Sequence, residues 1–174
     1  ACISPAQRVA RCVRVTYDST VLYDDMSNGG GIACDIENAI RMDADCMAVQ
    51  TFIGASGESR SLELLCRTAD AGARYGIPTL GVVAVGKEME RTEKFFLLAT
   101  RVLAENGANI VKSYYCDGFE RVAAACPVPI VIAGGKKLPE LEALEMAYRA
   151  IAEGARGVDM GRNIFQSDCP AGMA

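Results

Sequence analysis

A chain of 174 residues with 51% hydrophobic and 23% charged residues has enough apolar material for a sizeable core, so we expect a single domain over 1–174, or part of one. The net charge of −4 excludes a general electrostatic attraction to nucleic acid or to an anionic membrane, because an acidic surface releases no counterions from either. No apolar run approaches the roughly 20 residues of a membrane span. The acidic charge therefore makes small-molecule chemistry the favoured function.

The first 44 residues are less regular than those that follow. The stretch RCVRVTY over 11–17 predicts a strand, SNGGGI over 27–32 a loop, and DIENAIRMD over 35–43 a short helix. These elements would form the first βα unit of the chain.

From Ala44 onward, an apolar run of strand length, a turn and an amphipathic stretch of helical period follow one another repeatedly. Strands are predicted over 45–53, 77–85, 108–115, 127–134 and 157–161. Helices are predicted over 58–76, 91–107, 118–126 and 138–154. Three helices end in a glycine that suits a left-handed cap, namely Gly76, Gly107 and Gly154.

The last of these helices carries large apolar residues on one face, which we expect to cover the sheet: Leu141, Leu144, Tyr148 and Ile151. Six βα units with near-continuous apolar strands indicate a parallel sheet, either doubly wound or part of a barrel. Because a complete (β/α)8 barrel needs about 200 residues or more, the chain is an open sheet or an incomplete barrel.

A single lysine, Lys112, interrupts the apolar run of the strand over 108–115. Alternation places it on one face with Ile110 and Tyr114. Burial lowers the pKa of an unpaired lysine, and the neutral amine is a nucleophile toward carbonyl carbon. The alternative is that Lys112 pairs with a carboxylate such as Asp159, or with a bound phosphate, and does no covalent work.

Two loops could hold a phosphate. The strand over 127–134 ends in Gly134-Gly135 followed by two lysines, and the final strand is followed at once by Gly161-Arg162-Asn163. Backbone N–H groups at such glycines can approach an anion closely, and barrels often build a phosphate site from the loops after their last two strands. The alternative is a pair of tight turns with solvated charges.

Other residues give weaker signals. Gln50 shares a strand face with Ala48 and Phe52, and Lys87 follows the strand over 77–85, so each could line a pocket. Tyr114 and Asp159 are two further candidates for pocket residues. The eight cysteines form no CxxC pair and the chain has no histidine, so we expect no metal site. Scattered reduced cysteines are typical of a cytoplasmic protein.

The segments NIVKSYY, GFERVAAACPVPIVIAGGKKLPELEALEMA and GVDMGRNIFQSD resemble the class I aldolases that use a lysine Schiff base, the archaeal-type fructose-bisphosphate aldolase group. The resemblance extends over about 45–170 and is strongest to the thiolase branch of that group. It implies a (β/α)8 TIM barrel of which strands three to eight are present. It also implies that Lys112 is the Schiff-base lysine, and that Gly134, Gly135, Gly161 and Arg162 hold the substrate phosphate.

The same resemblance implies a phosphorylated dicarbonyl or ketose as substrate, no tightly bound cofactor, coenzyme A as the acyl acceptor, and a homo-oligomer. The chain departs from the aldolase pattern because it lacks an FDHG-like segment, and because Ala84 and Ala133 stand where aldolases have a proton-donating tyrosine and a phosphate-binding serine. Both replacements favour the thiolase branch. The alternatives are a class I fructose-bisphosphate aldolase, a non-catalytic sugar-phosphate-binding barrel fragment, and a ribulose-phosphate-type barrel that uses only the phosphate loops.

Overall fold

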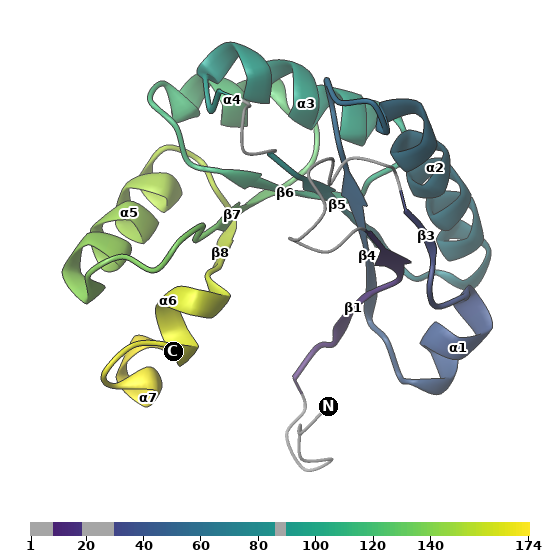
Figure 1. Cartoon of the computed structure of the whole chain (residues 1–174), viewed down its shortest axis with the longest axis horizontal. Coiled ribbons are helices and arrows are strands. Elements are labelled where there is room, and N and C mark those ends of the chain that lie inside the picture. Colours follow the sequence, from purple (N-terminus) through teal and green to yellow (C-terminus); the bar gives the residue numbers. More distant parts are fainter. Residues whose placement is uncertain (1–8, 19–29, 86–89) are drawn as a thin grey trace.

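The computed structural model describes residues 9–18, 30–85 and 90–174. Its main feature is a curled sheet of six parallel strands (Figure 1). Each strand of this sheet pairs with the strand of the same sheet that follows it in the sequence. In spatial order the strands are β1 (Cys12–Arg14), β4 (Cys46–Thr51), β5 (Thr79–Val83), β6 (Ile110–Tyr114), β7 (Ile130–Ala133) and β8 (Gly157–Asp159). The predicted order of six parallel strands is confirmed.

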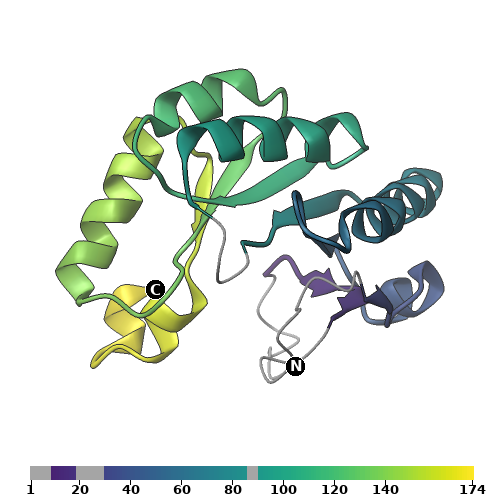
Figure 2. The same ribbon diagram turned by 45° about the horizontal axis from the view of Figure 1, so that its top comes forward.

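Helices connect the successive strands and lie along the outer side of the curled sheet in both views (Figure 1, Figure 2). They are α1 (Ile36–Arg41), α2 (Glu58–Tyr75), α3 (Glu93–Glu105), α4 (Phe119–Ala125) and α5 (Glu140–Ala152), followed by the short α6 (Gly161–Phe165) and α7 (Pro170–Met173). Each predicted helix is present, and the three predicted cap glycines have φ angles of 72°, 99° and 114°. Within the described residues no helix is both long and apolar enough to cross a bilayer.

The hydrophobic core lies between the sheet and its helices. Alternate residues of each strand point outward into it, for example Val49, Val83 and Val111, which are at most 1% exposed. Phe96 of α3 and Phe119 of α4 cover these strands and are fully buried. The other residues of the same strands point to the concave side, which is therefore the side that is free for chemistry.

The strand expected over 11–17 is interrupted at Val15. Its N–H donates to the Ala48 carbonyl at 3.0 Å, in register with the sheet, whereas its carbonyl accepts from Ala33 and Cys34. The chain therefore leaves the sheet and continues as β2 (Thr16–Tyr17), which pairs with β3 (Gly31–Ile32) in a second, antiparallel sheet. The prediction of a loop over 27–32 is thus wrong for its last two residues, and 27–29 lie outside the described residues.

The predicted inner face of α5 is wrong. Its large apolar residues, expected to cover the sheet, are 48–77% exposed: Leu141, Leu144, Tyr148 and Ile151. Ala143 and Ala150 are the buried residues of this helix instead. Small side chains let a helix backbone approach its neighbours closely, so the alanines form the contact and the bulkier residues remain outside.

Candidate active site

Lys112 lies in the middle of the curled sheet, on its concave side. The neighbouring strands hold β6 on both sides, with Lys112 in register with Val82 of β5 and Val131 of β7. Val111 and Ser113 are fully buried against the helices, whereas the side chain of Lys112 is 23% exposed. The alternation predicted for this strand is confirmed, and the amine is directed away from the hydrophobic core.

Asp159 is the partner of this lysine. Lys112 Nζ donates a hydrogen bond to Asp159 Oδ2 at 2.6 Å, across the concave face from β6 to the end of β8. The ion pair named as the alternative interpretation of Lys112 therefore exists. It is also compatible with covalent chemistry, because a lysine that forms an imine needs a group within hydrogen-bond distance to exchange its proton.

A pocket of about 250 Å³ opens around this pair. Its lining residues are Cys12, Arg14, Ala48, Gln50, Leu80, Val82, Lys112 and Asp159. Three residues proposed from the sequence for the pocket, Gln50, Lys112 and Asp159, are thus brought together from β4, β6 and β8. The space is of the size that a small phosphorylated metabolite would fill.

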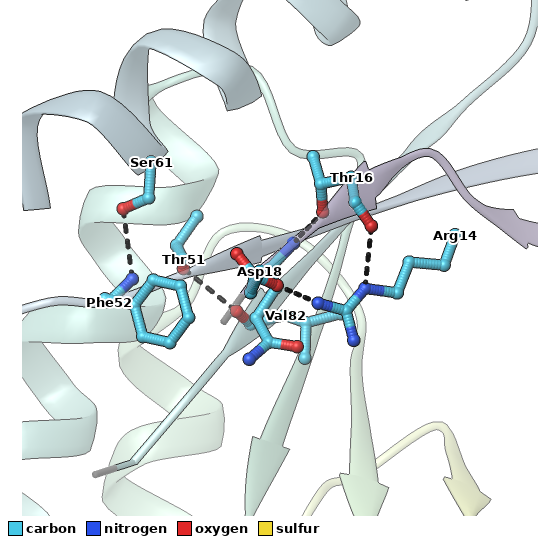
Figure 3. Close-up of polar contacts among 8 residues, drawn as sticks. Arg14, Thr16, Asp18, Thr51, Phe52, Ser61 and Val82 are labelled. Atoms are coloured by element: carbon cyan, nitrogen blue, oxygen red, sulfur yellow. Dashed lines mark hydrogen bonds and ion pairs between the residues drawn. The ribbon is translucent and has the colours of Figure 1, made fainter. Parts of the chain in front are cut away.

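Arg14 is a pocket residue that the sequence analysis missed. Its Nε donates to the Thr16 carbonyl at 3.1 Å, and its guanidinium forms an ion pair with Asp18, whose side chain is only 6% exposed (Figure 3). Burial lowers the pKa of Arg14 from its ordinary value. Strand alternation alone places Arg14 on the same face of β1 as Cys12, two residues earlier.

Asn163 joins the two loops that were expected to bind phosphate. Its Nδ2 donates to the Gly134 carbonyl at 3.0 Å, and its Oδ1 accepts from the Leu138 N–H at 2.7 Å. Asn163 is buried, with 3% of its surface exposed. The turn after β7 and the beginning of α6 are therefore held together, which places Gly134, Gly135, Gly161 and Arg162 in one region.

The close approach of these loops requires a glycine at 134. A Cβ atom added to Gly134 would lie 2.6 Å from Asn163 Nδ2 and 3.1 Å from the backbone Cα of Met160. Gly135 has a φ of 66°, in the left-handed region that other residues rarely adopt. The double glycine is thus explained by the geometry of the loop itself.

Arg91 adds a cation beside this loop. Its Cζ lies 4.2 Å from the centre of the Tyr114 ring, and a Cβ added to Gly135 would lie 3.6 Å from its Nη1. Tyr114, proposed from the sequence as a pocket residue, therefore stands between Lys112 and the glycine turn. Nothing in the sequence pointed to Arg91, which lies in an irregular segment, and the candidate Lys87 lies outside the described residues.

Three arginines belong to the pocket or to the two glycine loops. Arg14 lines the pocket and pairs with Asp18, Arg91 lies beside Gly135, and Arg162 follows Gly161 in the chain. Guanidinium groups can bind phosphate oxygens in pairs. In the three described ranges, no group of three or more His, Cys, Asp or Glu side chains is placed to hold a metal ion.

Comparison with known proteins identifies the family. A family model described as DeoC/LacD family aldolase matches residues 8–167. The chain belongs to the DeoC/LacD aldolase family. The predicted resemblance to lysine-dependent aldolases is thereby confirmed at the level of the family.

Several relatives are similar to this aldolase-family chain along most of its length. An uncharacterised aldolase of Pasteurella multocida is 51% identical over 98% of the chain and 59% of its own length. The 3-hydroxy-5-phosphonooxypentane-2,4-dione thiolases of Yersinia pseudotuberculosis and Photorhabdus laumondii are 55% and 50% identical, over 87% and 98% of the chain and 52% and 58% of their own lengths. The chain therefore spans between half and three fifths of the length of these relatives.

Solved aldolase structures share the fold of this chain. A Schiff-base-forming fructose-1,6-bisphosphate aldolase superposes with a TM-score of 0.87 at 22% identity, over 95% of the chain and 68% of its own. An archaeal fructose-1,6-bisphosphate aldolase with its catalytic lysine bound to a carbinolamine gives a TM-score of 0.83 at 23% identity, over 91% of the chain and 66% of its own. The incomplete TIM barrel expected from the sequence is confirmed.

Proposed function

We propose that this chain carries the Schiff-base lysine and the phosphate-binding loops of a thiolase-type active site. In this proposal the substrate is 3-hydroxy-5-phosphonooxypentane-2,4-dione, the acetyl group passes to coenzyme A, and dihydroxyacetone phosphate remains. The names of the relatives at 50–55% identity support this choice of substrate. The observation that carries the proposal is the position of Lys112, 2.6 Å from Asp159 in a pocket beside the Gly134–Asn163 contact.

The reaction would begin at the amine. Lys112 Nζ, after losing a proton toward Asp159, attacks the ketone carbon next to the phosphorylated CH₂ group, and loss of water gives an iminium ion. The thiolate of coenzyme A attacks the acetyl carbonyl, and the electron pair of the breaking carbon–carbon bond moves to the iminium nitrogen. Protonation of the resulting enamine carbon and hydrolysis release dihydroxyacetone phosphate and restore the amine.

The phosphate loops would position that ketone. The Gly134 and Gly161 loops bind the phosphate, with Arg162 and Arg91 as charge partners, while the reacting carbon extends toward β6. Tyr114 is two residues from Lys112 and directly beside Gly135, so the distance between the anchored phosphate and the amine is set by one rigid strand. Anchoring at a remote group supplies binding energy and orientation for the chemical step.

Borohydride reduction with dihydroxyacetone phosphate tests the imine. A reduced adduct on Lys112 blocks trypsin, so the label is expected in a single peptide over 102–121. Lys112→Arg keeps a positive charge for Asp159 but cannot form the imine, and is expected to abolish labelling. Lys94→Arg, an exposed replacement on α3, is the matched control and is expected to label like the parent chain.

The Lys112–Asp159 ion pair also supports a second candidate, a non-catalytic barrel that binds sugar phosphates. If the chain binds dihydroxyacetone phosphate in equilibrium dialysis but gives no adduct, Lys112 is an electrostatic anchor and the thiolase proposal is wrong. If an adduct forms, formation of acetyl-coenzyme A from the dione indicates the thiolase, whereas cleavage of fructose 1,6-bisphosphate indicates the aldolase.

Cytoplasmic location belongs to the same proposal. The seven cysteines of the described ranges are free thiols, as in proteins of a reducing compartment. Assembly into a homo-oligomer also stays a prediction, which light scattering of the purified chain would test.

A further inference from the structure

Two cysteines face each other at the beginning of adjacent strands. Cys12 of β1 and Cys46 of β4 are register partners in the parallel sheet. Neighbouring strands lie about 4.8 Å apart, and a disulfide requires Cα atoms separated by roughly 4.4–6.8 Å. Cys12 lines the pocket, and Cys46 has the same alternation as Ala48 and Gln50, which line it too. Both thiols therefore belong to the concave face.

The two thiols also interact with each other. A hydrogen bond links them, and it shifts the pKa values of the two thiols in opposite directions. Hydrogen bonds with Cys12 and with the backbone at Leu80 lower the pKa of the Cys46 thiol, although burial opposes them. The hydrogen bond with Cys46 and burial raise the pKa of Cys12. Because the thiolate is the nucleophilic form of cysteine, the lower pKa favours Cys46 as the sulfur that reacts first, and its register partner Cys12 as the one that resolves it.

We propose that Cys12 and Cys46 form an oxidisable dithiol, which a peroxide converts into a disulfide across β1 and β4. The Cys46 thiolate attacks one peroxide oxygen and the oxygen–oxygen bond breaks, which gives a sulfenic acid and, after protonation, one molecule of water. The Cys12 sulfur then attacks the sulfenic sulfur, a sulfur–sulfur bond forms, and the hydroxyl group leaves with the Cys12 proton as a second water. Hydrogen peroxide is reduced by two electrons and the thiol pair is oxidised by two.

The disulfide would join the two strands whose following residues line the pocket. Arg14 lies two residues after Cys12 on the same face of β1, and Ala48 and Gln50 follow Cys46 in the same way on β4. A covalent bond at the first residues of both strands fixes the spacing of the side chains further along them. The inference does not depend on the substrate of the site, since it rests on the thiols alone.

Peptide mapping of the folded chain tests the proposal. Trypsin releases Cys12 in the peptide over 12–14 and Cys46 in the peptide over 42–60, and each contains a single cysteine. After treatment with hydrogen peroxide and alkylation, we expect these two peptides to appear as one cross-linked species that lacks two hydrogen atoms. Dithiothreitol is expected to release both. We also expect Cys46 to lose its free thiol about tenfold faster than the exposed Cys169.

Two variants separate the pair from general cysteine oxidation. Cys12→Ser removes the resolving thiol, and we expect Cys46 sulfenic acid to accumulate and to be trapped by dimedone. Cys169→Ser is the matched control and is expected to leave the cross-linked species unchanged. The proposal is overturned if the folded parent chain gives no 12–14/42–60 species, if that species appears only in denaturant, or if Cys46 and Cys169 react at the same rate.

Discussion

Replacing Asn163 by alanine removes both hydrogen bonds that hold the turn after β7 against α6. The Gly134 carbonyl loses its donor at 3.0 Å, and the Leu138 N–H loses its acceptor at 2.7 Å. Asn163 is 3% exposed, whereas Gly134 and Leu138 are half-buried, so water can replace only part of what is lost. We therefore expect a destabilised chain in which the Gly134 and Gly161 loops no longer keep their spacing.

The size of this effect follows from the number of bonds. Each hydrogen bond contributes about 0.5–1.5 kcal/mol net, and two of them give a loss of about 2 kcal/mol in the free energy of unfolding. For a domain of about 150–250 residues, a loss of 1 kcal/mol lowers Tm by roughly 2–4 °C, so the variant should melt about 4–8 °C lower.

Urea unfolding followed by circular dichroism measures the change. Asn38→Ala on the exposed face of α1, where the side chain only accepts a bond from Arg41, is the control and is expected to cost no more than about 0.5 kcal/mol. If Asn163→Ala unfolds at the same urea concentration as the parent chain, the contact between the loops is not a stabilising one. A phosphate site preformed by this contact would then be excluded.

Three further changes have defined outcomes. Tyr115→Phe should lower the free energy of unfolding at neutral pH, because the hydrogen bond to Glu153 raises the pKa of Tyr115 to about 12. This contribution is present below the unfolded pKa of about 10 and is lost as the pH rises through 12. Urea titrations in which the two chains differ by a constant amount up to that pH would contradict it. On α5, Leu144→Ser should change the free energy of unfolding by no more than about 0.5 kcal/mol and Ala150→Leu should cost about 1–3 kcal/mol; the reverse order in thermal melts would show that the buried face is misassigned. Arg91→Ala should raise the half-saturating concentration of dihydroxyacetone phosphate in borohydride trapping by roughly tenfold or more, whereas the exposed Arg101→Ala should leave it unchanged; equal values for both would exclude Arg91 as a phosphate ligand.

The repeating part of the fold was predictable because hydrophobic periodicity and the turn and capping residues indicate the same elements there. The strand around Lys112 alternates as expected, and the helix over 91–107 ends where Gly107 predicts, since a φ of 99° suits glycine. The ion pair of Lys112 with Asp159 was also among the expected outcomes. Parallel strands bring their carboxyl ends to one edge of the sheet, so a residue at the end of one strand can be paired with a residue on another.

The errors concern features that depend on close contacts. The apolar face of α5 was assigned to the core by hydrophobicity, although Ala143 and Ala150 make the contact, because hydrophobicity does not show how near a helix must come. The chain leaves the sheet at Val15 because the Val15 carbonyl accepts hydrogen bonds from Ala33 and Cys34. Hydrophobic periodicity does not indicate such a contact. Arg91 was missed for a similar reason, since its position beside Tyr114 exists only after the chain has folded.

The pairing of each strand with the next one in the sequence makes the sheet a linear array of similar units. Interactions in such an array extend mainly to the nearest neighbours, so its stability approximates a sum over adjacent interfaces. Opening β1 or β8 breaks one interface, whereas opening β5 or β6 breaks two. Lys112 on β6 is therefore anchored where local opening is rarest. Its ion-pair partner Asp159, like Cys12, lies on an outermost strand of the described sheet, where opening is most frequent.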